Sequence, residues 1–89
     1  MDRPNLKSNK PHIKYDKFSD VLYISLGNPC DGLAKDIGGG NFIRINPQTN
    51  EVIGITILDF MERYSLNENT DIQETATELI PTILKLYTH

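Results

Sequence analysis

The sequence contains a single cysteine, Cys30, and no tryptophan. One cysteine cannot form a disulfide within the chain, and scarce cysteine is typical of proteins from a reducing compartment. Cys30 stands between Pro29 and Asp31, in a segment that we expect to be a loop, while His12 and His89 lie far from it in the sequence. Because a catalytic thiol needs a neighbouring base or a helix N-terminus to lower its pKa, we interpret Cys30 as an inert loop residue.

Long apolar runs and an excess of positive charge are also missing. No stretch approaches the ~20 apolar residues of a membrane-spanning helix, and no signal-peptide core follows Met1, so we expect a cytoplasmic protein. Nine Lys and Arg against twelve Asp and Glu give a net charge of −3. Nucleic acid would require a local basic patch, and the lysines between Lys7 and Lys17 are better explained as a solvated arm.

The length of 89 residues indicates one domain with a thin hydrophobic core. Residues 1–11 contain prolines and asparagines and few apolar side chains, which favours a flexible N-terminal arm. Residues 12–89 then form a single small α+β domain. Because its own core is thin, such a domain would gain stability from a partner subunit.

Alternating apolar and polar residues predict a series of short strands. The expected strands are Ile13–Tyr15, Val21–Leu26, Leu33–Ile37 as an edge strand, Asn41–Ile45 and Val52–Leu58. On the last of these strands, Ile53, Ile55 and Ile57 are predicted to face the same way as Ile43 and Ile45. Pro47 favours a type I turn between the last two strands, and Asn50 tolerates the left-handed position that follows. Such short links predict an antiparallel β-meander of four or five strands.

After Asp59 the pattern changes to that of helices. Residues 60–64 predict one helical turn, and Thr70 with Gln73 fits a capping box that would open a longer helix. An apolar stripe at helical spacing predicts one amphipathic face; its members are Ile72, Ala76, Leu79, Ile80, Ile83, Leu84 and Tyr87. Pro81 interrupts this pattern, so the helix is expected to kink or break there. The predicted fold is α+β, with this C-terminal helix packed on one face of the meander.

No catalytic, cofactor-binding or metal-binding residue is predicted. A hydrolase would need two converging carboxylates or a set that holds a metal, but turn preference explains the aspartates at 16, 20, 31, 36 and 59. The run Gly38–Gly40 leads into a strand rather than a helix, and neither Lys-Ser nor Lys-Thr follows it. We therefore interpret it as a flexible turn and not as a phosphate loop.

The sheet face that the helix would leave uncovered is a candidate interface. Aromatic, aliphatic and arginine side chains are expected there: Tyr23, Phe42, Arg44, Val52 and Leu58. Scattered exposed apolar residues are ordinary on protein surfaces, whereas Tyr, Phe and Arg are enriched at interfaces. Association through this face, or through a sheet edge, would produce a homo-oligomer.

Two segments resemble a known family. Tyr15-Asp16 with Asp20–Leu26, and then Val52–Asp59, is similar to the domain-of-unknown-function family 2283, over about residues 13–64. The resemblance implies a small β-meander followed by helix, in microbial proteins without an accepted activity. Some members lie beside small toxin-like genes, which implies an antitoxin or partner role. Thr56 stands where the family usually has an acidic residue, so no role of that residue carries over.

Two functions remain open from the sequence. The first is a non-enzymatic protein-interaction module, homo-oligomeric and antitoxin-like. The second is a small enzyme or ligand-binding domain that uses the aspartates at the sheet ends. A flat apolar outer face favours the first function, and a pocket lined by those aspartates favours the second.

Overall fold

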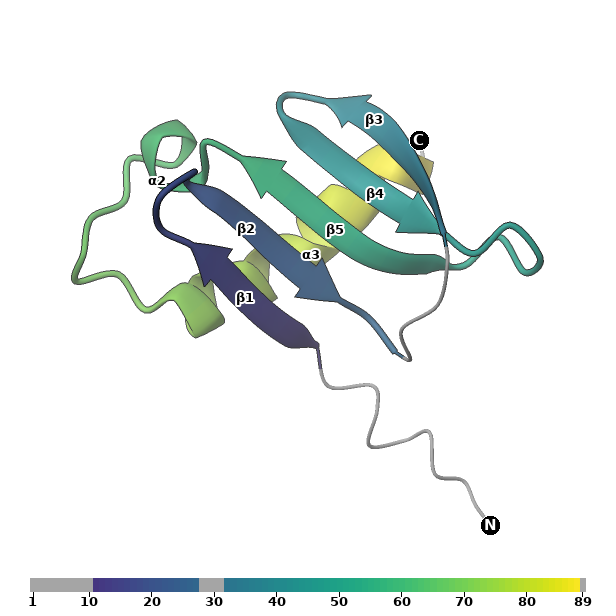
Figure 1. The fold of residues 1–89 in the computed structure, drawn as a ribbon, viewed down its shortest axis with the longest axis horizontal. Coiled ribbons are helices and arrows are strands. Elements are labelled where there is room, and N and C mark those ends of the chain that lie inside the picture. Colours follow the sequence, from purple (N-terminus) through teal and green to yellow (C-terminus); the bar gives the residue numbers. More distant parts are fainter. Residues whose placement is uncertain (1–10, 28–31, 89) are drawn as a thin grey trace, which may run out of the picture.

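The computed structural model of the protein describes residues 11–27 and 32–88. The strands are β1 (His12–Asp16), β2 (Val21–Ser25), β3 (Leu33–Gly38), β4 (Asn41–Ile45) and β5 (Val52–Leu58). Two helices follow them, α2 (Phe60–Arg63) and α3 (Ile72–Thr88) (Figure 1). Cys30 and residues 1–10 of the predicted arm 1–11 lie outside the described residues.

The strands form one antiparallel sheet in the order β1-β2-β5-β4-β3. A β1–β2 hairpin and a β3–β4–β5 meander are joined where β2 pairs with β5. The predicted α+β meander with a C-terminal helix is thereby confirmed, and β3 is an edge strand, as predicted. Turn chemistry fixes the last hairpin, since Asn50 adopts a φ of 66° and donates its N–H to the Asn46 carbonyl at 2.7 Å.

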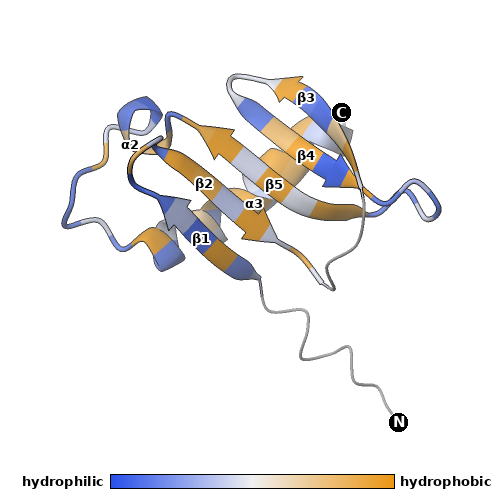
Figure 2. Ribbon diagram, viewed as in Figure 1, coloured by the Kyte–Doolittle hydropathy of each residue, from blue (hydrophilic) through white to orange (hydrophobic). Residues whose placement is uncertain are grey.

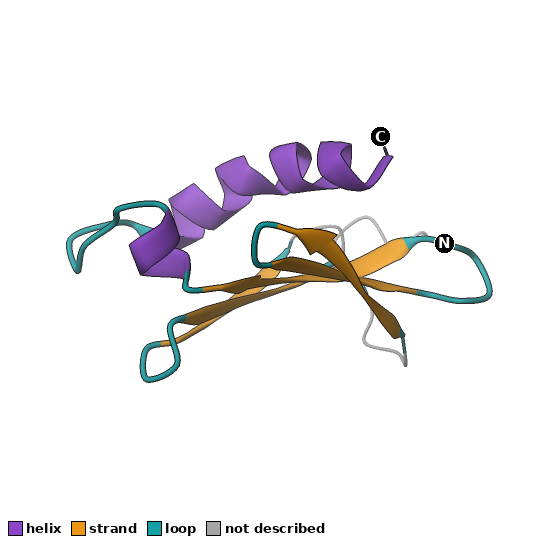
Figure 3. Cartoon of the chain, turned by 90° about the horizontal axis from the view of Figure 1, so that it is seen from above, coloured by secondary structure: helices purple, strands orange, loops and turns teal. Residues whose placement is uncertain are grey.

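The molecule has two layers, the sheet and α3, which lies along one side of it (Figure 3). The core between the layers is built mainly from one face of the three central strands and from α3. Its buried members are Leu22, Ile24, Ile43, Ile45, Ile55, Ile57, Phe60, Ala76 and Ile83. Phe60, the first residue of α2, packs between Tyr15 and Tyr64 with tilted rings, at ring-centroid distances of 5.9 and 5.8 Å. The turn of helix after β5 thus closes one end of the core.

Helix α3 continues through Pro81 without a break. All seven residues of the predicted stripe belong to the core cluster or pack against it, which confirms the amphipathic reading. The cap is shifted by one residue from its predicted place. Asp71 Oδ1 accepts the Glu74 N–H at 3.1 Å, whereas the Thr70 hydroxyl accepts the Asn67 N–H. No helix in the described part of the chain is long and apolar enough to cross a membrane.

The predicted side-chain directions fail at the start of β5, where Val52 packs against the core and Ile53 does not belong to the core cluster. The pairing of Arg44 with Gly54 is followed by the pairing of Ile45 with Val52, so that Ile53 is an extra residue in the ladder. Such a β-bulge shifts the register by one residue and reverses the face of the residues beyond it. Val52 therefore packs against the core instead of facing outward. It does not belong to the outer face.

Candidate functional site: the outer face of the sheet

The outer face of the sheet, opposite α3, is organised in rows that cross the strands. The central row consists of Lys14, Tyr23, Thr56, Phe42 and Asp36, each the register partner of the next, from β1 to β3. A second row, one step along the strands, consists of His12, Ser25, Gly54, Arg44 and Ala34. A third row begins with Asp16, Val21 and Leu58. Register and pleat together place these side chains on the face away from the core.

Apolar side chains occupy the middle of this face, and charges occupy its edges. Tyr23 is 42% exposed and Leu58 36% exposed, while Phe42, on the other side of Thr56 from Tyr23, is partly buried. Lys14 on β1 and Asp36 on β3 are exposed at the two ends of the central row. Apolar and polar residues alternate along the strands of the sheet (Figure 2), as expected where one face covers the core and the other does not. An apolar centre within a polar rim is the usual anatomy of a protein interface.

Four of the five candidate interface residues lie where the sequence predicts them. Tyr23, Phe42, Arg44 and Leu58 belong to the outer rows, and only Val52 does not. Arg44 lies across Gly54, because a Cβ added to that glycine would come 3.7 Å from the Arg44 Cβ and Cδ. A side chain at position 54 would therefore be in van der Waals contact with the arginine stem, and its Cβ would lie 3.3 Å from the Ile24 carbonyl oxygen.

The described aspartates that the sequence offers as an alternative site gather at one end of the sheet, but each has a structural partner. Asp16 Oδ1 accepts the N–H groups of Phe18 and Ser19, and hydrogen bonds from Ser19 hold the pKa of Asp16 below its ordinary value. Asp36 Oδ1 accepts the Gly38 N–H at 2.8 Å. Asp59 Oδ2 lies 3.9 Å from Arg63, and its side chain makes no capping bond to α2. Asp31 falls outside the described residues.

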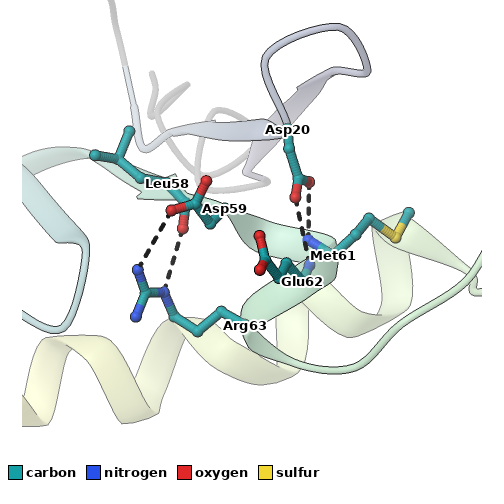
Figure 4. A network of polar contacts seen from close by, with 6 residues as sticks. All are labelled: Asp20, Leu58, Asp59, Met61, Glu62 and Arg63. Carbon is teal, nitrogen blue, oxygen red and sulfur yellow. Dashed lines mark hydrogen bonds and ion pairs between the residues drawn. The ribbon is translucent and has the colours of Figure 1, made fainter.

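Asp20 has the most contacts of this group, because it caps α2 from another part of the chain (Figure 4). Its main-chain carbonyl accepts the Phe60 N–H at 3.0 Å. Its carboxylate accepts the N–H groups of Met61 at 2.8 Å and Glu62 at 3.3 Å. The first three N–H groups of α2, which have no partner inside a helix, are therefore all satisfied by one residue.

The Tyr15 hydroxyl completes this network by donating to Asp20 Oδ1 at 2.7 Å. Partial burial raises the pKa of Asp20, but the hydrogen bonds from Met61, Tyr15 and Glu62 together outweigh it, and the net pKa is lowered. The same bond to the Asp20 carboxylate is the main reason why the pKa of Tyr15 is raised to about 12. The Asp20 carboxylate is therefore an ionised hydrogen-bond acceptor, and both of its oxygens bind donors of the protein itself. This arrangement favours a structural role for Asp20.

Asp71, Glu74 and Glu78 line an open hollow at the start of α3. Beside the network is an open groove of about 490 Å³ with one carboxylate; it is lined by Tyr15, Lys17, Met61, Leu66, Asn67, Glu68 and Ile72. Among residues 11–27 and 32–88, no three His, Cys, Asp or Glu side chains come together in a way that could hold a metal ion. Gly39 and Gly40 form the β3–β4 turn with φ angles of 63° and 81°, in keeping with the predicted glycine turn.

Sequence reasoning missed the ends of the central row. Lys14 and Asp36 each occur in a short strand beside residues of mixed character, and neither attracts attention alone. Their relation emerges only when the strand order places β1 and β3 at opposite edges, at equal distances from β5. The alternation of residues along β1 and β3 predicts which face of the sheet Lys14 and Asp36 lie on. No signal in the sequence predicts the order of the strands.

No protein-family model, curated protein or solved structure matches this chain. The resemblance to family 2283 therefore stays a prediction.

Proposed function

We propose that this protein is a non-enzymatic interaction module that binds another protein chain through the outer face of its sheet. The observation that carries the proposal is the exposed apolar centre of that face, where Tyr23 is 42% exposed, Leu58 is 36% exposed and Phe42 lies across Thr56 from Tyr23. Aromatic side chains in such a position have a large apolar surface to remove from water, at about 25 cal/mol per Å². The polar rim supplies orientation.

The resemblance to family 2283 adds a biological setting to this proposal. A partner or antitoxin-like role beside a second small protein would use the same face. We further propose that the protein acts in the cytoplasm, in keeping with its single cysteine. The alternative, an enzyme or ligand-binding domain built on aspartates at the sheet ends, has no specific support, because the described aspartates bind backbone groups or pair with Arg63.

Photo-crosslinking in the host cell tests whether the face binds a protein. A photoreactive phenylalanine analogue replaces Tyr23 in one strain and Glu78, which is exposed on α3, in a control strain. We expect a discrete adduct from position 23 that disappears when Phe42→Asp is added, and none from position 78. Equal labelling at both positions, or no adduct at position 23, would contradict the proposal.

A further inference from the structure

Resting on the proposed function, we infer that the outer face binds a second copy of the chain, related by a two-fold axis along β5. In a two-fold interface each surface contacts itself, so residue i meets residue j and residue j meets residue i. The charge pattern of the central row, with Lys14 at one end and Asp36 at the other, meets this requirement for one direction of the axis only.

The strand order sets the geometry of this arrangement. Strand β5 is the middle strand of five, with β2 and β4 on either side and β1 and β3 at the edges. Strands are spaced about 4.8 Å apart, so the two edge positions of a row lie at equal distances, about 10 Å, from the middle strand. Rotation about an axis along β5 therefore exchanges β1 with β3 and β2 with β4, and leaves each row on itself.

Applied to the central row, this rotation produces complementary contacts. Lys14 comes to lie over Asp36 of the second copy, and Tyr23 over Phe42 of the second copy, each contact occurring twice. Thr56 lies on the axis and meets its own copy. Opposite charges thus meet at both edges, and an aromatic pair fills the space on each side of the centre. Sheets that pack in this way keep their strands within about 30° of each other.

The other two-fold axis that could bring the faces together runs across the strands. It would place Lys14 on Lys14 and Asp36 on Asp36, and facing like charges disfavour an interface. Lys14 and Asp36 thus favour the axis along β5 and disfavour the axis across the strands. We assign to Lys14 and Asp36 the role of fixing the orientation of the copies, while the aromatic residues provide the buried area.

The size of the face indicates a weak dimer. Five strands of about five residues cover about 24 by 17 Å, which corresponds to about 800 Å² for both copies together. Specific interfaces of this size are at the weak, reversible end of the range. The association should therefore be measured at high protein concentration. In such a weak dimer, changing a charge at the rim should produce a measurable change in the dissociation constant.

A charge exchange followed by sedimentation equilibrium tests this arrangement with the purified full chain, at about 10 μM to 1 mM. Lys14→Glu and Asp36→Lys should each weaken the dimer about tenfold, because each creates two contacts between like charges. The double variant restores both contacts with reversed sign, and should return to within about threefold of the wild type. Lys17→Glu, in the β1–β2 turn, and Glu78→Lys, on α3, change the net charge equally and should leave the dimer unchanged.

Three other outcomes would contradict either the dimer itself or the axis along β5. A wild type that remains monomeric at about 1 mM ends the inference, whereas the photo-adduct at position 23 would still support binding of a different protein. The axis along β5 is rejected if the double variant dimerises no more tightly than either single variant, provided that all variants show native circular dichroism. Equal weakening by Lys17→Glu would mean that net charge alone acts, and would also reject it.

Discussion

A single carboxylate, that of Asp20, ties the β1–β2 turn to the helix that follows β5. It accepts two N–H groups of α2 and the hydroxyl of Tyr15. The Asp20 backbone has a φ of 57°, which among residues other than glycine is tolerated best by asparagine and aspartate. The Arg63 side chain secures the other side of the same turn by donating Nε–H to the Leu58 carbonyl at 3.2 Å. These contacts hold the end of the sheet against the core.

We predict that Asp20→Asn lowers the free energy of unfolding by about 1–2 kcal/mol near neutral pH, because the charge of the acceptor is lost. The pKa of Asp20 is lowered in the folded protein, so its contribution is complete above the ordinary aspartate pKa of 3.8 and is lost as the pH falls through the folded value. The difference from wild type in urea denaturation should therefore shrink on acidification below pH 3.8. Asp36→Asn, which affects one exposed hydrogen bond, should cost less than about 0.5 kcal/mol.

Tyrosine absorbance provides a second readout of the same variant. One of the four tyrosines should ionise at about 12 in the wild type, and its pKa should fall towards 10 in Asp20→Asn. Since Tyr15 has a raised pKa in the folded state, its contribution to stability is present below pH 10 and is lost as the pH rises towards 12. An unchanged titration, together with an acid-independent loss of stability, would contradict the role assigned to Asp20.

Sequence reasoning at the residue scale succeeded where the partner is close along the chain. The positive φ at Asn50 and the bonds of Asp16 to its own turn follow from local turn chemistry. The capping of α2 by Asp20 could not be predicted, because donor and acceptor are separated by about forty positions and meet only after β2 has paired with β5. The bulge at Ile53 could not be predicted, because the apolar residues of β5 continue through it without any change of pattern that would mark an extra residue.

At the scale of elements, α3 combines a strong apolar stripe with a proline in its interior. Packing of the stripe against the sheet outweighs the loss of one hydrogen bond, which for Pro81 would have been donated to the Thr77 carbonyl. Of the two predicted outcomes, a break at Pro81 does not occur, because the apolar stripe packs on both sides of the proline and the structure keeps a single helix. Its N-terminus begins after Asp71 rather than after Thr70, a shift of one residue that capping patterns alone do not resolve.

We predict that Pro81→Ala stabilises the protein by about 1–3 kcal/mol, because alanine restores the missing donor and removes the clash with the preceding turn. The Pro81 side chain is exposed, so its removal leaves no cavity. Thermal and urea unfolding would show the gain. Thr82→Ala, at an exposed neighbouring position, is the control and should change stability by less than about 0.5 kcal/mol. A loss of stability in Pro81→Ala would mean that the proline itself shapes the contact of α3 with the sheet.

The whole molecule is a sheet with one covered face and one uncovered face (Figure 3). Alternation predicts which side chains share a face, and four of the five candidate interface residues were placed correctly for that reason. Alternation does not specify which strand pairs with which, so the order β1-β2-β5-β4-β3 could not be predicted. That order carries the two-fold arrangement inferred above, because it places Lys14 and Asp36 at opposite edges and the two aromatic rings between them.

A dilution series of isotope-labelled protein by NMR tests most directly whether the outer face binds a second chain. We predict concentration-dependent shifts that are confined to the outer rows, above all at Tyr23, Phe42, Thr56 and Arg44. Amides of the exposed positions on α3, such as Glu74 and Glu78, should not move. Shifts along the β1 or β3 backbone alone would indicate pairing of sheet edges instead. Spectra independent of concentration up to about 1 mM would contradict self-association by the face.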